Sequence, residues 1–109
     1  MANTFKLKTK ANVGVTTVGI YTAPASTTTV VIGITLANTS GAGVNVGVGI
    51  TRAGATEDVK LLKNAPIPQG SSLEFMGGNK VVFEETDTVT VDSDTNNSID
   101  AALTIMEIT

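Results

Sequence analysis

The sequence predicts an all-β fold, a single antiparallel β-sandwich of jelly-roll-like type with eight to nine short strands. Three observations lead to this prediction. Apolar and polar residues alternate with a period of two in many short segments, and no segment keeps a helical period. Thr and Val are abundant, and their β-branched side chains fit a pleated surface. Turn residues separate the segments at sandwich-like spacing, and residues 1–109 contain no linker, which indicates one domain.

The first predicted strand lies near the N-terminus, where Phe5 and Leu7 alternate with Lys6 and Lys8. One face of this strand is therefore apolar and the other is cationic. Residues 1–10 are expected to form either an arm that contacts a neighbouring protein or an edge strand that lysines protect from unwanted pairing. The candidate partner-binding residues are Phe5, Lys6, Leu7, Lys8 and Lys10.

Three more strands are expected before the middle of the chain. A short strand around residues 18–20 runs toward Pro24, which ends pairing because proline has no N–H to donate. Residues 29–36 and 44–50 show the clearest alternation of apolar and small or polar residues. A turn cluster at residues 38–43 lies between these two segments, so they are expected to pair as a β-hairpin.

The second half of the chain continues the same pattern. Turns are expected at residues 53–56 and 77–79, which are rich in Gly. Residues 66–70 contain two prolines and are expected to form a stiff connector. The five further strands are expected at residues 59–61, 73–75, 81–83, 89–91 and 99–105.

Composition removes most of the usual equipment for catalysis. The chain contains no Cys, His or Trp, so Ser–His and Cys–His nucleophiles and the commonest metal ligand are missing. The remaining catalytic candidates are the carboxylates of Glu84, Glu85 and Asp87, for which a solvated run of charges at a turn is the preferred interpretation. We therefore expect a protein that is not an enzyme and that needs no cofactor.

The formal net charge of −3 argues against nucleic acid as a partner, because nucleic-acid binding needs a cationic surface. No apolar run reaches the roughly 20 residues of a membrane span, and no signal peptide is visible, so we expect synthesis in the cytoplasm and no membrane contact. Residues 1–64 carry six cations and two carboxylates, whereas residues 65–109 carry one cation and eight carboxylates. These halves either complement each other between neighbouring copies or mix within one copy.

Residues 92–100 form the sharpest local candidate for a metal site. Four oxygen-bearing side chains follow the early spacing of a calcium loop, and Ca²⁺ prefers hard oxygen ligands. Asn97 and Leu103 stand where such a loop needs a glycine and a bidentate glutamate, and the flanks are predicted strands. A solvated hairpin loop without metal is therefore the preferred interpretation. The weak candidate ligands are Asp92, Asp94, Asn96 and Asp100.

Four segments carry a family resemblance, namely residues 21–24 (Tyr-Thr-Ala-Pro), 28–39, 64–73 and 106–109 (Met-Glu-Ile-Thr). They resemble segments of small virion proteins of tailed phages, especially phages that infect cyanobacteria and other aquatic bacteria. Capsid decoration, or cement, proteins of this size are β-rich and often trimeric. The resemblance thus implies a virion structural protein on the capsid exterior, which forms a homo-oligomer, a trimer in particular, and contacts the major capsid protein or other virion proteins.

The sequence leaves three functions open. The first is a capsid decoration protein that stabilises the capsid lattice, where many weak contacts add through effective concentration. The second is a neck, tail or fibre-attachment component of the same virion. The third is a ligand-binding β-module for carbohydrate or calcium, which the small number of aromatic residues, one Tyr and three Phe, disfavours.

Overall fold

The computed structural model describes residues 3–52, 58–75 and 80–109, so the turns expected at residues 53–56 and 77–79 lie outside the described residues. The described residues form nine strands and no helix, and hence no helix long and apolar enough to cross a membrane. The all-β prediction is confirmed. The strands are β1 (Asn3–Val13), β2 (Val18–Thr22), β3 (Thr28–Asn38), β4 (Val44–Thr51), β5 (Asp58–Ile67), β6 (Ser72–Phe75), β7 (Val81–Phe83), β8 (Thr88–Ser93) and β9 (Ile99–Ile108).

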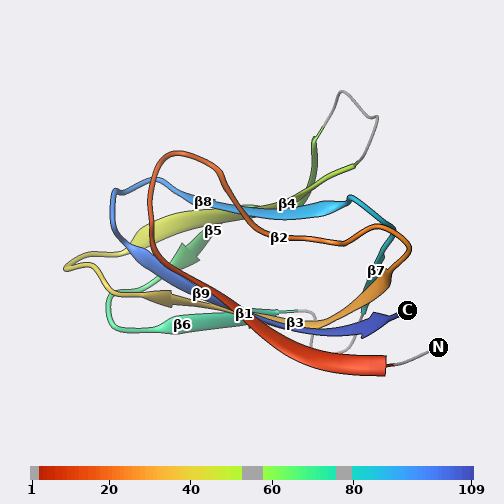
Figure 1. The fold of residues 1–109 in the computed structure, drawn as a ribbon. Coiled ribbons are helices and arrows are strands. Elements are labelled where there is room, and N and C mark those ends of the chain that lie inside the picture. The colour runs from red at the N-terminus through yellow and green to blue at the C-terminus, as the bar shows by residue number, and fades with distance from the viewer. Residues whose placement is uncertain (1–2, 53–57, 76–79) are drawn as a thin grey trace.

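The strands form two antiparallel sheets that pack face to face (Figure 1). The five-stranded sheet, here sheet A, has the order β1-β9-β3-β6, and β7 pairs with β3 as well. The four-stranded sheet, here sheet B, has the order β2-β8-β4-β5. The chain changes sheets at most connections, and the resulting strand order is that of a jelly roll built from two Greek keys. The predicted β-sandwich is therefore confirmed.

The predicted hairpin between residues 29–36 and 44–50 is wrong. β3 belongs to sheet A and β4 to sheet B, so the turn between them crosses from one sheet to the other. Asn38 fixes this corner, because its side-chain amide donates to the carbonyl oxygens of Ala42 (2.8 Å) and Ile67 (3.0 Å). The apolar faces of the two strands consequently meet across the core instead of lying side by side.

The core lies between the sheets and consists mainly of aliphatic side chains. Leu103 and Ile105 of β9 are fully buried, as are Val48 and Val91 of sheet B. Phe83 of β7 is among the largest side chains that are fully buried. Because strand residues alternate between faces, every second residue of sheet A points away from this core. The outer face of sheet A is the surface on which the candidate site lies.

Pro66 lies inside β5, so the predicted connector at residues 66–70 begins later, at Pro68. β5 is an edge strand of sheet B, and β4 is its only neighbour among the described strands of that sheet. A proline at a sheet edge is tolerated because the N–H that it lacks can face the open side, where no ladder hydrogen bond is formed. The prediction was therefore wrong for Pro66 and ended this strand too early.

Candidate functional site

The lysines of β1 lie on the inner side of sheet A. β1 is an edge strand and pairs with β9, where Lys6 is opposite Ile105 and Lys8 is opposite Leu103. Both of these β9 residues are fully buried, so the two lysines point toward the rim of the core, and Lys10 follows on the same side. Inward-pointing charges on an edge strand discourage a further strand from pairing there. Three of the predicted partner-binding residues, Lys6, Lys8 and Lys10, therefore protect the β1 edge of sheet A from pairing with a further strand.

Lys6 connects β1 to a buried carboxylate. Its Nζ lies 2.9 Å from Oε1 of Glu107, whose side chain is 8% exposed. The hydroxyl of Tyr21, which comes from sheet B, donates a hydrogen bond of 2.6 Å to Oε2 of Glu107. Oγ1 of Thr29 lies 2.7 Å from the same tyrosine hydroxyl, and it donates because the phenol proton is already directed at Glu107. This network ties three strands of sheet A to sheet B.

The network shifts the pKa values of both acids in it. Burial, together with the hydrogen bond to Glu107, raises the pKa of Tyr21 to about 12. The hydrogen bonds donated by Tyr21 and Lys6 lower the pKa of Glu107 below its ordinary value, against the opposing effect of burial. At neutral pH, Glu107 is therefore an anion with a donor at each oxygen, and Tyr21 is a neutral donor. Both groups are in the protonation state that keeps the network intact.

The outer face of sheet A carries an apolar row that crosses four strands. Phe5 on β1 is opposite Met106 on β9, which is opposite Val30 on β3, which is in turn opposite Val82 on β7. Residues that are directly opposite one another point to the same face of a sheet. Phe5 and Val82, at the two ends of the row, are 69% and 59% exposed. We call these four residues the apolar row.

Two further rows lie beside the apolar row on the same face. The middle row consists of Leu7, Thr104 and Gly33, and Leu7 is 65% exposed. The low row consists of Thr9, Ala102, Thr35 and Glu74. Except for Glu74, the side chains of the low row are short. The predicted partner-binding residues Phe5 and Leu7 thus belong to a larger surface that spans several strands.

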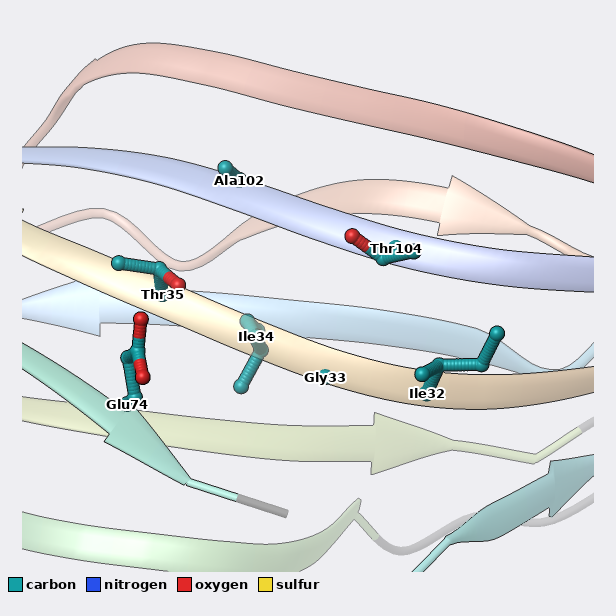
Figure 2. Close-up of a pocket in the computed structure, with 7 residues that line it drawn as sticks. All are labelled: Ile32, Gly33, Ile34, Thr35, Glu74, Ala102 and Thr104. Atoms are coloured by element: carbon teal, nitrogen blue, oxygen red, sulfur yellow. The ribbon is translucent and has the colours of Figure 1, made fainter. Parts of the chain in front are cut away.

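A depression of about 340 Å³ opens between the middle and low rows, beside a bulge in β3 between Val31 and Gly33. Figure 2 shows the residues around it, with Gly33 and Thr35 on β3 and Ala102 on the neighbouring β9. Nothing lies within 4 Å of the position that a Cβ on Gly33 would take. A second depression of about 330 Å³ continues past Ala102 along β1. One half of the outer face is therefore raised and apolar, and the other half is hollow.

The candidate calcium ligands lie around residues 94–98, which connect β8 of sheet B to β9 of sheet A. The hairpin interpretation of this loop is therefore wrong, because the loop joins the two sheets. Three of its carboxylates accept hydrogen bonds from separate donors, and the described residues contain no group of three or more acidic, His or Cys side chains placed to hold a metal ion. The donors are the Thr17 hydroxyl for Asp92 (3.0 Å), the Asn45 N–H for Asp94 (3.2 Å) and the Asn12 N–H for Asp100 (3.0 Å). The fourth candidate, Asn96, lies beside Gly14. A Cβ atom added to Gly14 would be 3.0 Å from Oδ1 of Asn96.

The acidic cluster at residues 84–87 stabilises the turn between β7 and β8. Asp87 is buried and accepts hydrogen bonds from the backbone N–H of Glu84 (2.9 Å) and from Nε of Arg52 (3.1 Å). Glu85 accepts a hydrogen bond of 2.8 Å from the backbone N–H of Ser26. These contacts hold the corner of the sandwich together and account for the cluster in structural terms.

Ion pairs join the basic and acidic halves of the chain within one copy. In each pair the cation comes from residues 1–64 and the carboxylate from residues 65–109. In these contacts the opposite charges of the two halves are therefore paired within one copy. The pairs are Lys6–Glu107, Arg52–Glu84, Arg52–Asp87 and Lys60–Asp92.

Sequence reasoning found one end of this surface and missed the rest. Alternation assigned Phe5 and Leu7 to one face, but only the strand register places Met106, Val30 and Val82 in line with Phe5. The buried network was missed as well. Its signal was Glu107, because it continues the inward phase of β9 as a charged residue among aliphatic ones.

Comparisons with known proteins show the fold. A scan against protein-family models found no match, and a search of curated proteins found none either. A search of solved structures found a chain described as belonging to Bacillus endospore appendages, a family of disulfide-linked pili. The TM-score is 0.60 at 17% sequence identity, and the match covers 99% of this chain and 87% of that chain. The two chains therefore share an architecture along almost their whole length.

Proposed function

We propose that this chain is a structural subunit of a multimeric particle and that the outer face of sheet A is its assembly surface. The observation that carries this proposal is the apolar row, which is in register across four strands, with its ends exposed and its centre half-buried. Among the residues of the three rows, Glu74 alone is charged. Exposed apolar patches with a polar rim are typical of protein interaction sites.

The finer proposal is a capsid decoration protein on the exterior of a tailed-phage capsid, in contact with the major capsid protein or other virion proteins. The resemblance of residues 21–24, 28–39, 64–73 and 106–109 to small phage virion proteins supports it. A subunit with a broad sheet face suits a lattice, because many weak contacts add through effective concentration. A neck, tail or fibre-attachment component is the alternative within the same particle.

A pilus-like polymer is the second candidate, favoured by the fold that this chain shares with a subunit of the endospore appendages. Those pili are described as disulfide-linked. The present sequence contains no Cys, so disulfides cannot link copies of it. In this version of the function the outer face of sheet A supplies one contact between subunits, and a filament needs a second contact surface as well.

Quantitative mass spectrometry of purified virions tests the finer proposal. An amount close to equimolar with the major capsid protein would support capsid decoration, and a small fraction of that amount would place the chain in the neck or tail. Absence from virions combined with presence in purified filaments would favour the polymer. Absence from both would overturn the proposal and would put a carbohydrate- or calcium-binding module first.

The assembly surface is tested by a matched pair of variants. Phe5→Ser changes the apolar row, whereas Val59→Ser changes a side chain that is 46% exposed on β5 of sheet B. Both are expected to fold, because each replaces an exposed side chain. Incorporation into the particle should fall for Phe5→Ser and stay unchanged for Val59→Ser. Equal incorporation of the two variants would remove the outer face of sheet A from the proposal.

A further inference from the structure

We propose that a second copy of this chain covers the outer face of sheet A through an isologous, two-fold contact. The proposal rests on the structural role proposed above, since it names the partner of the assembly surface. It follows from the order of the three rows, in which the raised apolar row and the hollow low row lie on opposite sides of the middle row.

The face is complementary to itself. Along β1 the rows are represented by Phe5, Leu7 and Thr9, each two residues from the next, and β9 repeats this spacing in the opposite direction. A two-fold axis laid along the middle row, in the plane of the contact, turns one copy over the other and exchanges the outer two rows. Each apolar row then lies above the low row of the other copy. In an isologous contact both copies use the same patch, which is the relation that this face satisfies.

On β1 and β9, the side chains that meet under this rotation differ in size in the required way. Phe5 of one copy lies above Thr9 of the other, and Met106 lies above Ala102. The depression of about 340 Å³ beside Gly33 gives further room on β3 (Figure 2). Large side chains set over small ones allow two sheets to interdigitate at their ordinary separation of about 10 Å.

The available area reaches the minimum for a specific pair. The face extends across four strands and along residues 3–11 of β1, which corresponds to roughly 500 Å² per copy at ordinary strand spacings. Two copies would bury roughly 1,000 Å², which is about the minimum for a specific interface and below the roughly 1,200 Å² of a stable one, so we expect a dimer that dissociates on dilution. Val82 of one copy lies above Glu74 of the other, and Glu74 ends the low row at the edge of sheet A, where its carboxylate can remain in contact with water. Pairing through the edge of β1 is the competing contact, and the inward-pointing lysines disfavour it.

The contact closes on itself. Once two copies have joined, neither leaves this face open, so the expected species in solution is a dimer. The trimer implied by the phage resemblance would require a different surface, and a head-to-tail contact would give an open polymer. Molecular mass in solution therefore separates the three arrangements.

Sedimentation equilibrium of the full 109-residue chain is the first test. The expected mass is twice the 11.1 kDa of one chain. Phe5→Ser removes a large side chain from the apolar row, and Ala102→Arg places a large charged side chain in the low row. Each substitution is expected to weaken self-association by roughly tenfold or more. Val59→Ser on sheet B is the control and should leave the dimer intact. Melting temperatures establish that each variant is folded.

Cross-linking through a single cysteine tests the position of the axis. The sequence has no Cys, so Thr104→Cys introduces a unique thiol in the middle row. That residue faces its own counterpart across the axis, and a bismaleimide that spans about 10 Å should join the two copies. Val59→Cys is the matched control and should not be joined. This experiment does not depend on weakening the contact.

Several results would overturn the two-fold pair. They are a monomer over the whole concentration range, a trimer or an open polymer, equal association of Ala102→Arg and Val59→Ser, and equal cross-linking of the two cysteine variants. The amount of the chain in purified virions is measured independently. A monomer that is nevertheless abundant in virions would remove the two-fold pair and leave the structural role standing.

Discussion

The absorbance of Tyr21 can be used to follow the buried network, because this residue is the only tyrosine in a chain without tryptophan. Its folded-state pKa of about 12 lies above the ordinary value of 10.0. The stability contributed by the neutral phenol is therefore complete below about pH 10 and is lost as the pH rises toward 12. We expect the phenolate absorbance of the folded protein to appear about two pH units later than that of the protein in urea. Superimposable titration curves would contradict the buried hydrogen bond to Glu107.

Gly47 leaves room for the carboxylate of Asp92 on the neighbouring strand. A Cβ at this position would lie 2.5 Å from Oδ1 of Asp92, whose other oxygen accepts a hydrogen bond from Thr17. Because Oδ1 of Asp92 is the end of a side chain that can turn away, we expect Gly47→Ala to lower the free energy of unfolding by about 1 kcal/mol, through loss of the hydrogen bond between Thr17 and Asp92. Urea denaturation measures the change. Gly33→Ala is the matched control, because its Cβ would meet nothing within 4 Å, and it should stay within about 0.5 kcal/mol of the parent.

At the scale of single strands, β1 is attached to the sandwich by backbone pairing and by one ion pair with a buried partner. Lys6→Met would leave Oε1 of Glu107 buried without its donor. Because Lys6 itself is 42% exposed, we expect a loss of roughly 1 kcal/mol, at the low end for a hydrogen bond to a charged group. Lys10→Met removes an equivalent charge from the same strand and should have little effect. Thermal denaturation of the two variants gives the comparison, and equal losses would show that Lys6 has no specific role.

The crossing from β8 to β9 is expected not to bind calcium tightly. Asp92, Asp94 and Asp100 each accept a hydrogen bond from a different part of the chain, so gathering them around one ion would break existing contacts. We expect calcium to leave the melting temperature unchanged and to give no heat in a calorimetric titration. A rise in melting temperature with calcium, abolished by Asp94→Asn, would restore the metal site as a candidate.

Alternation predicted where strands lie and which side of each is buried, because one buried face imposes a period of two on the sequence. It could not predict partners. The pattern of residues 29–36 and 44–50 is the same whether the two strands pair in one sheet or face each other across the core. In the folded protein, the Asn38 side chain stabilises the crossing between the sheets by donating a hydrogen bond to the carbonyl oxygen of Ile67. This residue is distant in sequence, so the local pattern does not reveal the contact. The candidate site shows the same limit of local patterns. Phe5 was recognised from the alternation in its own strand, whereas Val82 could be assigned to the apolar row only from the register of three strand pairings.

The whole molecule is organised by pairings between segments that are distant along the chain. β9, the last strand, lies between β1 and β3 in the centre of sheet A, and Figure 1 shows the two ends of the chain on the same side of the fold. Among strands that follow each other directly, β4 and β5 alone are paired in the described structure. Sheet A is therefore incomplete until the final residues are in place, and we expect folding to be slow, since distant strands must meet before their contacts form.

Two deletions of similar length should consequently have very different effects. Removing residues 99–109 takes away the central strand of sheet A, including Leu103 and Ile105 of the core, and should abolish cooperative unfolding. Removing residues 1–10 takes away most of an edge strand whose side chains are largely exposed, and should give a folded protein of lower stability in which β9 becomes the new edge. Far-UV circular dichroism during thermal denaturation distinguishes the two. A cooperative transition in the protein that lacks residues 99–109 would contradict the central role of β9. Loss of the fold on removing residues 1–10 would show that the fold requires β1 although this strand lies at the edge of sheet A.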